Sequence, residues 1–514
     1  MSEGVENPTN QSNEKEYEER KILIKSKIDS LINDKYKIGL ISILILALII
    51  RIYFLIISQN QAHWWDTLAF GSLAKNLVFH LWDSTNFIAS ESVIRPPLFP
   101  ILWALLIKIN FSELWTLILL EFTPSVLSVY LIYLIGKELY DKRIGILASF
   151  ILAVSWVQLF YTTRIMSDIP SFFFILASIY FFIRSYENIN LKFFFLSIFF
   201  LSLAVLTRYF YGMIGIIYLV ILITANKHHF LKNKSFWLGG ILGLIPLLIF
   251  FAINLISHGN FLPAAGFYTT SAAEKPGFAY YILGFIPHIF KIVFTILFVI
   301  GLIIVLLELF LGFDSINSIK KLRHHLFVIL ILFFPLIFFI FFLRAAEDRY
   351  LFLSFVSFIL IISHGIVFVY DYIRKYSKIV AVVLTIILLL FGAYSNLTFG
   401  NSLVIEKKTS FLQMKEAFLW IKDNTSKESI LVGEWIPPYA IYYAERRFAE
   451  GNSTDFDQLL DKSDYLVVNA FHPQDPWVVN YLQNNASSKL APVKSFFFDE
   501  NQQQPAVIIY KIEK

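Results

Sequence analysis

The chain has 514 residues, of which 57% are hydrophobic, 18% aromatic and only 16% charged. Soluble proteins carry charge on about a quarter of their residues, so this composition excludes an ordinary soluble protein and indicates a multi-spanning membrane protein. The net charge of +5 comes from small separate basic clusters, which excludes a nucleic-acid-binding surface, and the absence of cysteine excludes disulfides and thiolate chemistry.

Residues 1–37 form a polar, charge-rich tail that ends in a basic stretch. Basic residues next to a span favour the cytoplasmic side, so we expect this tail to be cytoplasmic. The apolar segment 38–57 that follows is long enough to cross a membrane, and no small-residue cleavage site comes after it. It is therefore predicted to stay in the protein as the first helix.

Apolar segments of roughly the ~20 residues that a span needs recur up to residue 397 and predict about eleven helices. They are residues 38–57, 114–135, 144–161, 169–183, 193–206, 211–225, 236–256, 285–311, 326–343, 350–370 and 379–397. Every second loop between them is basic, which predicts that the amino terminus lies inside and the carboxyl terminus outside. The shorter apolar stretch 97–109 is placed as an interfacial or re-entrant helix within a large first exterior loop, residues 58–113.

Two carboxylates fall on the predicted exterior side, Asp66 in the string His63-Trp64-Trp65-Asp66 and Asp168 before the fourth helix. Each has a plainer interpretation as a helix N-cap, and the two tryptophans as anchors at the membrane interface. However, ionisable groups that converge on one boundary of a bundle indicate function. A divalent metal near His63 and Asp66 is possible, although one such pair is far short of a ligand set.

Several arginines share this side. Arg95 precedes two prolines, which hold it in an extended conformation that suits phosphate binding. Arg349 and Tyr350 open the tenth predicted span, where a snorkelling arginine and an interfacial tyrosine are the plainer interpretation. Arg164 lies four residues before Asp168, so a local ion pair is the alternative there. Arg208 follows the fifth predicted span.

The composition changes after residue 397 to mixed charge with short apolar stretches. Residues 430–432, 465–468 and 506–510 are predicted strands, and residues 411–421 have a helical pattern. Residues 398–514 are therefore predicted to form a small soluble α/β domain outside the membrane. Four glycosylation sequons lie at or beyond the last span and are compatible with that placement; they begin at Asn396, Asn424, Asn452 and Asn485.

The order of these motifs resembles that of the GT-C glycosyltransferases. An acidic residue follows the first helix, then come Arg95-Pro-Pro-Leu, Arg164-x-x-x-Asp168 and a late Arg349-Tyr350-Leu. The pattern is most similar to the dolichyl-phosphate-mannose protein mannosyltransferase and aminoarabinose transferase superfamily, and it covers residues 38–397. Many members of that superfamily carry Asp-Glu in the first loop, whereas this chain has Asp66-Thr67.

The resemblance implies a mainly α, polytopic bundle in the cell membrane, with the active site on the exterior face. It implies transfer of a mannose-like sugar from a polyprenyl- or dolichyl-phosphate donor to an exterior protein, glycan or lipid acceptor, with inversion. Membrane lipids would surround the apolar bundle, which would hold the prenyl chain. The roles implied are general base for Asp66, acceptor positioning for Asp168, and binding of the lipid phosphate for Arg95, Arg164, Arg208, Arg349 and Tyr350.

Two other classes of function remain open from the sequence. A transporter or flippase for a lipid-linked or anionic substrate would also use basic residues, but transporters usually show paired repeats and charges near the bilayer centre. Here the charges gather at one boundary and no repeat is evident. A non-catalytic membrane scaffold with an exterior binding domain is the third interpretation.

Overall fold

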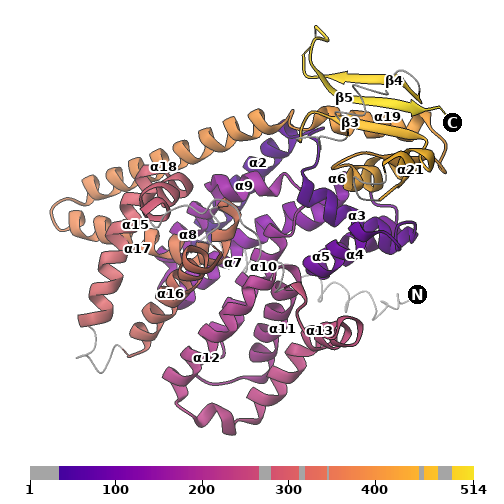
Figure 1. Cartoon of the computed structure of the whole chain (residues 1–514). Helices are drawn as coiled ribbons and strands as arrows, with labels where there is room; N and C mark the ends of the chain where they lie inside the picture. Colours follow the sequence, from indigo (N-terminus) through magenta and orange to yellow (C-terminus); the bar gives the residue numbers. More distant parts are fainter. Residues whose placement is uncertain are drawn as a thin grey trace, which may run out of the picture.

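The computed structural model of the protein describes residues 34–264, 279–311, 319–343, 347–450, 456–472, 478, 489–499 and 501–513. Most of the predicted cytoplasmic tail and the sequons at Asn452 and Asn485 lie outside these residues. The described part is a large helical bundle with a small sheet near the carboxyl terminus (Figure 1). This agrees with the mainly α fold with a C-terminal α/β unit that the sequence predicts.

Seven helical runs in the described part are long and apolar enough to cross a membrane. Several consist of consecutive helices with different hydrogen-bond patterns. The runs are α2 (Lys35–Ile57), α6 (Glu113–Leu117) with η1 (Ile118–Phe122) and α7 (Thr123–Leu139), α13 (Lys234–His258), η4 (Tyr280–Phe285) with α15 (Ile286–Leu311), α16 (Ile319–Ile337) with η7 (Phe338–Leu343), η8 (Asp348–Leu351) with α17 (Phe352–Arg374), and α18 (Lys378–Lys407).

Shorter apolar helices complete the bundle. They are α5 (Leu98–Lys108), α10 (Asp168–Ile183), α11 (Leu191–Thr207), and η2 (Tyr209–Gly212) with α12 (Met213–Asn226), which η3 (His229–Lys232) follows. The first of these corresponds to the short apolar stretch 97–109, and the others correspond to three of the predicted spans. In the described part of the chain, length and composition therefore support seven membrane spans. The number is eight if one bent pair of helices is counted as a single span.

That bent pair corrects one predicted helix. The sequence predicts a single span over residues 144–161, but α8 (Lys142–Val154) and α9 (Trp156–Thr162) meet at an angle of 52°. Ser155 between them is extended, with φ −64° and ψ 117°. The break leaves the backbone N–H of Trp156 without a helical partner, and it donates to Oδ1 of Asn396 on α18 at 3.5 Å. A side chain from another helix thus satisfies the backbone group that the break releases.

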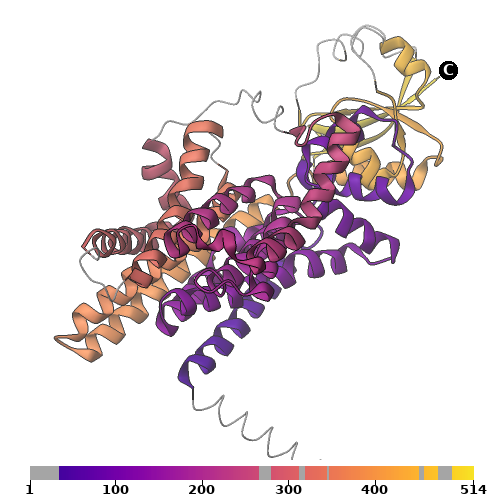
Figure 2. The same cartoon turned by 90° about the horizontal axis from the view of Figure 1, so that it is seen from below.

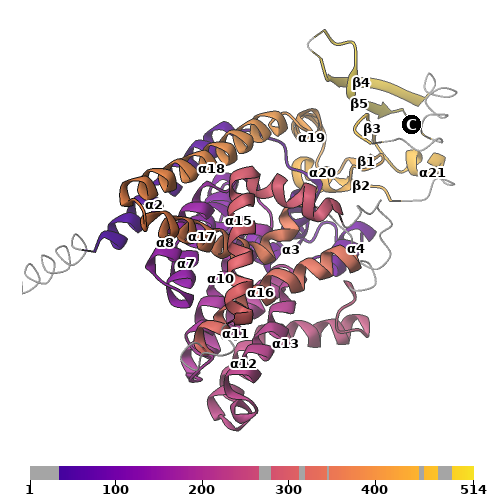
Figure 3. The same cartoon turned by 90° about the vertical axis from the view of Figure 1, so that its left-hand side faces the viewer.

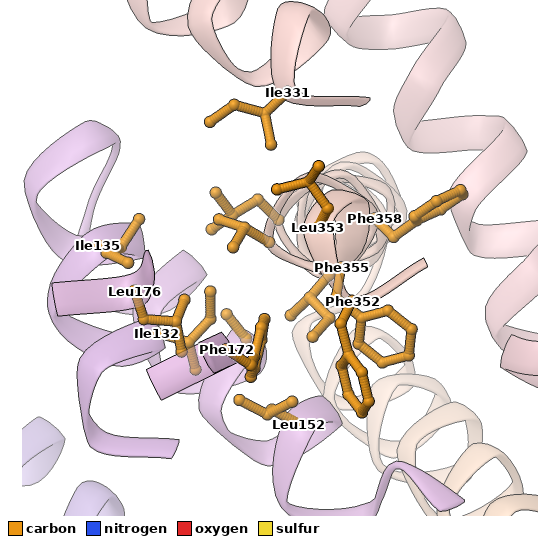
Figure 4. Close-up of a cluster of buried hydrophobic side chains, with 14 of the residues drawn as sticks. Ile132, Ile135, Leu152, Phe172, Leu176, Ile331, Phe352, Leu353, Phe355 and Phe358 are labelled. Carbon is orange, nitrogen blue, oxygen red and sulfur yellow. The ribbon is translucent and has the colours of Figure 1, made fainter. Parts of the chain in front are cut away.

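The core of the bundle is centred on α17. Its residues from Phe352 to Ile362 are all buried, and a helix that is apolar all round lies inside a protein or bundle. Figure 4 shows Phe352 and Phe355 beside Phe172 of α10, with Phe358 pointing away from α10 and residues of α7, α8 and α16 around the cluster. The turn η8, which contains Arg349, leads directly into this helix, so the core fixes the position of that arginine.

Two glycines allow α15 and α17 to cross with their backbones in close contact. A Cβ atom on Gly301 would collide with the carbonyl oxygen of Ile361, and one on Gly365 would collide with that of Leu297. Small residues at such crossings are typical of membrane bundles. The close crossing therefore depends on both glycines.

We expect Gly365→Ala to force these helices apart and to destabilise the protein by about 1–3 kcal/mol, the usual cost of overpacking. Thermal unfolding of the purified protein in detergent measures the effect as a lower Tm. Gly240→Ala on α13 is the matched control, because its Cβ would lie 3.7 Å from the ring of Phe194, an ordinary contact. Equal Tm values for the two variants would contradict the close crossing.

The C-terminal region forms a mixed five-stranded sheet in the order β2-β1-β3-β5-β4. Its strands are β1 (Ile430–Val432), β2 (Arg447–Phe448), β3 (Tyr465–Asn469), β4 (Leu490–Phe497) and β5 (Pro505–Ile512). β1 is parallel to β2 and β3, with Leu431 opposite Tyr465, whereas β5 is antiparallel to β3 and β4. The three predicted strands and the predicted helix, α19 (Leu412–Asn424), are present, and β2 and β4 are additional.

The C-terminal region packs against the helices of the first loop. These are α3 (Trp65–Phe79), α4 (Asn86–Ile94) and α5, and they lie beside the C-terminal region in all three views (Figures 1, 2 and 3). The helical turns α20 (Pro437–Tyr439) and η9 (Ala440–Ala444) are buried there, and Leu460 of α21 (Phe456–Asp461) packs in a separate apolar cluster with Val432 of β1 and Leu466 of β3. One continuous apolar cluster joins the first-loop helices to α19 and the sheet.

Candidate active site

Asp66 lies in the first turn of α3, not at its N-cap. The N-cap position belongs to Trp64, and no side chain caps this helix end. The N-cap interpretation of Asp66 is therefore wrong. Arg95 is the C-cap of α4, and its φ of −95° and ψ of 135° are extended, as the proline that follows it predicts. The turn η8 carries Arg349, which lies 283 residues after Asp66 in the chain.

The carboxylate of Asp66 is held between two guanidinium groups. Nη2 of Arg95 donates to its Oδ1 at 2.9 Å, and Nη1 of Arg349 donates to its Oδ2. Each arginine has a second acid partner, because Nε of Arg95 donates to Glu91 and Nε of Arg349 donates to Glu347. Five side chains thus form one continuous row of alternating charge with Asp66 at its centre.

These contacts fix the ionisation of Asp66. Burial raises the pKa of the Asp66 carboxyl, but Arg349 and Arg95 lower it by more, so the pKa lies well below its ordinary value. Asp66 is therefore ionised at neutral pH. In this arrangement it is also a weak proton acceptor, because a general base works best with a pKa near the operating pH.

A cavity of about 170 Å³ opens beside this row. It brings together five of the seven residues that the sequence singles out, and three of them are arginines. The lining residues are Asp66, Phe70, Ile94, Arg95, Pro96, Ser167, Arg208, Tyr209, Phe210, Arg349 and Tyr350. Three guanidinium groups around one small cavity form an arrangement that can bind the oxygens of a phosphate. We call this the arginine cavity.

Asp168 lies behind the arginine cavity and acts on it through Arg208. It is the first residue of α10 and its side chain is only 1% exposed. Nη2 of Arg208 lies 2.8 Å from its carboxylate, and Nε of Arg208 donates to Oγ of Ser167 at 3.2 Å. The Asp168 side chain does not cap its helix, so that plainer interpretation is wrong. The geometry makes Asp168 an orienting group for a cavity arginine.

Arg164 does not line the arginine cavity. Its guanidinium lies between two aromatic rings, 4.4 Å from the centroid of Trp64 and 3.7 Å from that of Phe160, and Nη1 donates to the carbonyl oxygen of Phe160. The local ion pair with Asp168 does not form, because Asp168 pairs with Arg208. Trp64 packs on this arginine, and Trp65 packs on Phe87 and Trp435, so both tryptophans make contacts within the protein.

Because Arg164 does not line the arginine cavity, its substitution should affect substrate binding less than substitution of Arg349. We expect Arg164→Met to leave the KM for an anionic lipid substrate unchanged, because methionine keeps the contacts with Trp64 and Phe160 and no cavity group is lost. Steady-state kinetics in detergent test this, with Arg349→Gln as the comparison. A large rise in KM for Arg164→Met would place this arginine in contact with substrate.

Glu91 and Glu347 are the outer partners of the charged row. The sequence places Glu347 on the exterior side but predicts no role for it, and Glu91 was not predicted, although it stands four residues before Arg95, a spacing that pairs side chains on a helix. The contacts of the C-terminal domain with the first loop were not predicted either. Nζ of Lys75 donates to the carbonyl oxygen of Tyr442 at 2.6 Å, and Nε1 of Trp82 donates to that of Arg446 at 3.0 Å.

The residues present do not fit a metal held by His63 and Asp66. Nε2 of His63 lies 2.8 Å from Oε1 of Glu113, and both carboxylate oxygens of Asp66 form ion pairs with arginines. Within the described ranges, no group of three or more histidine, cysteine, aspartate and glutamate side chains could hold a metal ion. We therefore derive no chemical step through a metal.

Comparisons with known proteins agree with this architecture. Residues 94–253 match the family model described as dolichyl-phosphate-mannose-protein mannosyltransferase. No curated protein matches the chain. The apo structure of ArnT from Cupriavidus metallidurans is 10% identical with a TM-score of 0.64, and the match covers 91% of this chain and 97% of ArnT.

Two further solved structures carry a lipid phosphate. ArnT from Cupriavidus metallidurans bound to undecaprenyl phosphate is 10% identical, with a TM-score of 0.61 and the same coverage of 91% and 97%. The archaeal oligosaccharyltransferase AglB from Archaeoglobus fulgidus, in complex with an inhibitory peptide and a dolichol-phosphate, is 13% identical with a TM-score of 0.57. That match covers 84% of this chain and 69% of AglB.

At these identities the solved structures establish the fold, and the family model adds a match over the segment from Ile94 to Ile253 that contains Arg95, Asp168 and Arg208. The resemblance to the GT-C membrane glycosyltransferases is therefore confirmed: the chain has the fold of that superfamily over nearly its whole length.

Proposed function

We propose that this protein is a membrane glycosyltransferase that uses a polyprenyl-phosphate monosaccharide as donor and works with inversion at the anomeric carbon. One observation carries the proposal: Asp66 lies between Arg95 and Arg349 at the wall of a cavity with a third arginine. The GT-C fold and the lipid phosphates bound by ArnT and AglB support it. The family description supports a mannose-like sugar, and a protein, glycan or lipid would be the acceptor.

The proposed reaction exchanges one bond at the sugar. The acceptor oxygen or nitrogen forms a bond to the anomeric carbon, while the bond from that carbon to the phosphate oxygen breaks. The electron pair leaves with the lipid phosphate, whose growing charge Arg95 and Arg349 neutralise with their guanidinium groups. The acceptor proton goes to the carboxylate of Asp66, and Asp168 holds Arg208 in place beside them.

The donor itself would prepare Asp66 for this role. Each guanidinium has five N–H donors, and the two bonds seen for each arginine leave others free for phosphate oxygens. A bound phosphate shares the positive charge that now lowers the pKa of the Asp66 carboxyl. The pKa of Asp66 therefore rises when donor is present, and the base becomes stronger only when there is sugar to transfer.

The cell membrane, with the arginine cavity and the C-terminal domain on the exterior face, is the placement that the basic loops favour. Helix α3, which carries Asp66, lies at the same end of the bundle as the sheet, which is consistent with one shared side (Figure 1). Cysteine scanning tests this directly because the natural chain has none. A cysteine at an exposed position such as Asp423 would react with a membrane-impermeant maleimide added outside intact cells.

The test of activity is a panel of polyprenyl-phosphate sugars incubated with the purified full-length protein. We expect release of the lipid phosphate from at least one donor, slowly to water and faster when an acceptor is present. A transporter or flippase would move a lipid-linked substrate across vesicles without cleaving it. Absence of release from every donor, together with such movement, would replace the glycosyltransferase proposal with transport.

A further inference from the structure

Two further cavities lie where α15 and α17 end and α16 begins. One, of about 630 Å³, has a lining with many charged groups, and we call it the charged cavity. The other, of about 540 Å³, is mostly apolar, and we call it the apolar groove. The two spaces adjoin, because Ile304, Glu308, Lys321 and Phe368 line both of them.

Helix α17 connects these cavities with the candidate active site. Arg349 stands just before its first turn, whereas Phe368 and Asp371, which line the charged cavity, stand near its last turns. A helix rises 1.5 Å per residue, so about 30 Å of α17 separates the two places. The basic loops that predict the cytoplasmic side contain Arg143 and Lys321, so we expect these cavities at the inner leaflet of the membrane.

The charged cavity carries charges of both signs. Among the described residues, four carboxylates and three cations line it. Nη1 of Arg143 donates to both carboxylate oxygens of Asp371 at 3.1 Å, and Nζ of Lys321 lies 2.8 Å from Oε2 of Glu308. This balance does not favour a plain anion, in contrast to the three guanidinium groups of the arginine cavity. It suits a ligand that carries a cation and an anion together.

The ion pairs in the charged cavity keep hydrogen-bonding capacity for such a ligand. The side chains of Arg143, Asp371, Glu308 and Lys321 are between 36% and 54% exposed. An ammonium has three N–H donors, a guanidinium has five, and a carboxylate has about four lone-pair positions. The pairs that the structure shows therefore use only part of what these groups offer.

One ring nitrogen in the lining of the charged cavity is buried without a partner. Nε2 of His364 has no hydrogen-bond partner among the described residues, whereas His324 contacts the carbonyl oxygen of Leu139 and the hydroxyl of Tyr186. Buried polar atoms are usually hydrogen-bonded, so a ligand oxygen that accepts from His364 would relieve an unfavourable burial. In the described part of the chain the histidines here belong to no set of side chains that could hold a metal ion.

The apolar groove offers a surface for a hydrocarbon chain. Apart from Glu308, Lys321 and His325, its lining is aliphatic or aromatic. Leu307 and Leu311 are 52% and 73% exposed, so the groove opens toward the surface that lipid covers. Because Glu308 and Lys321 also line the charged cavity, the polar end of the groove is the place where the two spaces meet. An amphiphile can therefore occupy both at once.

We propose that these two cavities bind a zwitterionic phospholipid of the inner leaflet whose head group ends in a primary ammonium, as in phosphatidylethanolamine. An acyl chain lies in the apolar groove, and the phosphate accepts hydrogen bonds from Lys321 and His364. The ammonium donates to the carboxylate of Asp371. The site needs no sugar donor and no acceptor, so it goes beyond the proposed glycosyltransferase function and does not depend on it.

Native mass spectrometry of the full-length protein with added dioleoyl phosphatidylethanolamine or dioleoyl phosphatidylcholine tests the proposal. The two lipids share chains and phosphate, but the choline group has methyl groups in place of N–H donors. We expect one saturable site with a Kd about tenfold lower for phosphatidylethanolamine, because its ammonium makes a charge-assisted hydrogen bond. Asp371→Asn should bring the ratio of the two Kd values close to one. Lys321→Met should weaken the binding of both lipids about tenfold.

Asp423→Asn and Lys427→Met, the same changes at exposed positions of the C-terminal region, are the controls and should bind both lipids like wild type. The preference is a ratio measured on one protein, so partial unfolding cannot imitate its loss. Equal Kd values in wild type, an unchanged ratio in Asp371→Asn, or tighter binding of dioleoyl phosphatidylglycerol, which would make this an anion site, would each overturn the proposal. Release of lipid phosphate from the donor panel is measured separately, so donor cleavage without lipid preference refutes this site alone.

Discussion

We expect Asp66→Asn to lower kcat for sugar transfer by roughly 10²–10⁴-fold, the usual contribution of a general base. Asparagine keeps the shape of the side chain and can still accept a hydrogen bond from one arginine, but it cannot take the acceptor proton. The measurement is release of lipid phosphate by purified protein with saturating donor. Wild-type turnover in a folded Asp66→Asn protein would remove Asp66 from the mechanism.

The control for this variant is Asp423→Asn, the same change at an exposed position of α19. A second readout separates catalysis from folding. The pKa of Asp66 is depressed in the folded protein, so its ion pairs stabilise the fold above the unfolded value of about 3.9 and lose that effect as pH falls. The Tm difference between wild type and Asp66→Asn should therefore stay constant near neutral pH and shrink as the pH falls below about 4.

The second large effect is expected from Arg349→Gln. This change removes a guanidinium that lines the arginine cavity and holds Asp66, so kcat/KM for the donor should fall roughly 10²–10³-fold. Arg349→Lys should recover only part of the loss, because an ammonium keeps the charge but not the planar fork. Donor saturation curves for the three proteins measure the effect.

The same variant changes the pH profile in a defined direction. Arg349 is one of two cations that lower the pKa of the Asp66 carboxyl, so its removal raises that pKa toward the ordinary value. The acidic limb of the profile of kcat/KM should move to higher pH. Arg374→Gln, at the exposed far end of α17, is the control. An unshifted acidic limb in Arg349→Gln would contradict the assignment of that limb to Asp66.

The sequence was informative about the fold because long apolar runs and basic loops are local signals. Each predicted span except residues 144–161, which form two helices, corresponds to one helical run in the structure, and the resemblance to GT-C enzymes follows from motif order. The break at Ser155 was not predictable in this way. It depends on Asn396, which lies 240 residues away and pairs with the backbone that the break exposes.

For the candidate site, too, the sequence identified the residues but not the partners with which they interact. Motif order identified five residues that the arginine cavity brings together. It did not identify their partners, because the nearest arginine in sequence to Asp168 is Arg164, which stacks on aromatic rings, whereas Arg208 makes the ion pair. The partners of His63 are further still, since Tyr442 and Tyr443 belong to the C-terminal domain.

Phosphorus NMR of the donor tests the central claim most directly. In a polyprenyl-phosphate sugar the phosphorus is a diester, and transfer of the sugar converts it to the monoester of the free lipid phosphate. With a matching donor and acceptor, wild-type protein should convert the diester signal to the monoester signal, and Asp66→Asn should leave the diester signal in place. Conversion at the same rate by both proteins, or by neither with any donor of the panel, would contradict the account.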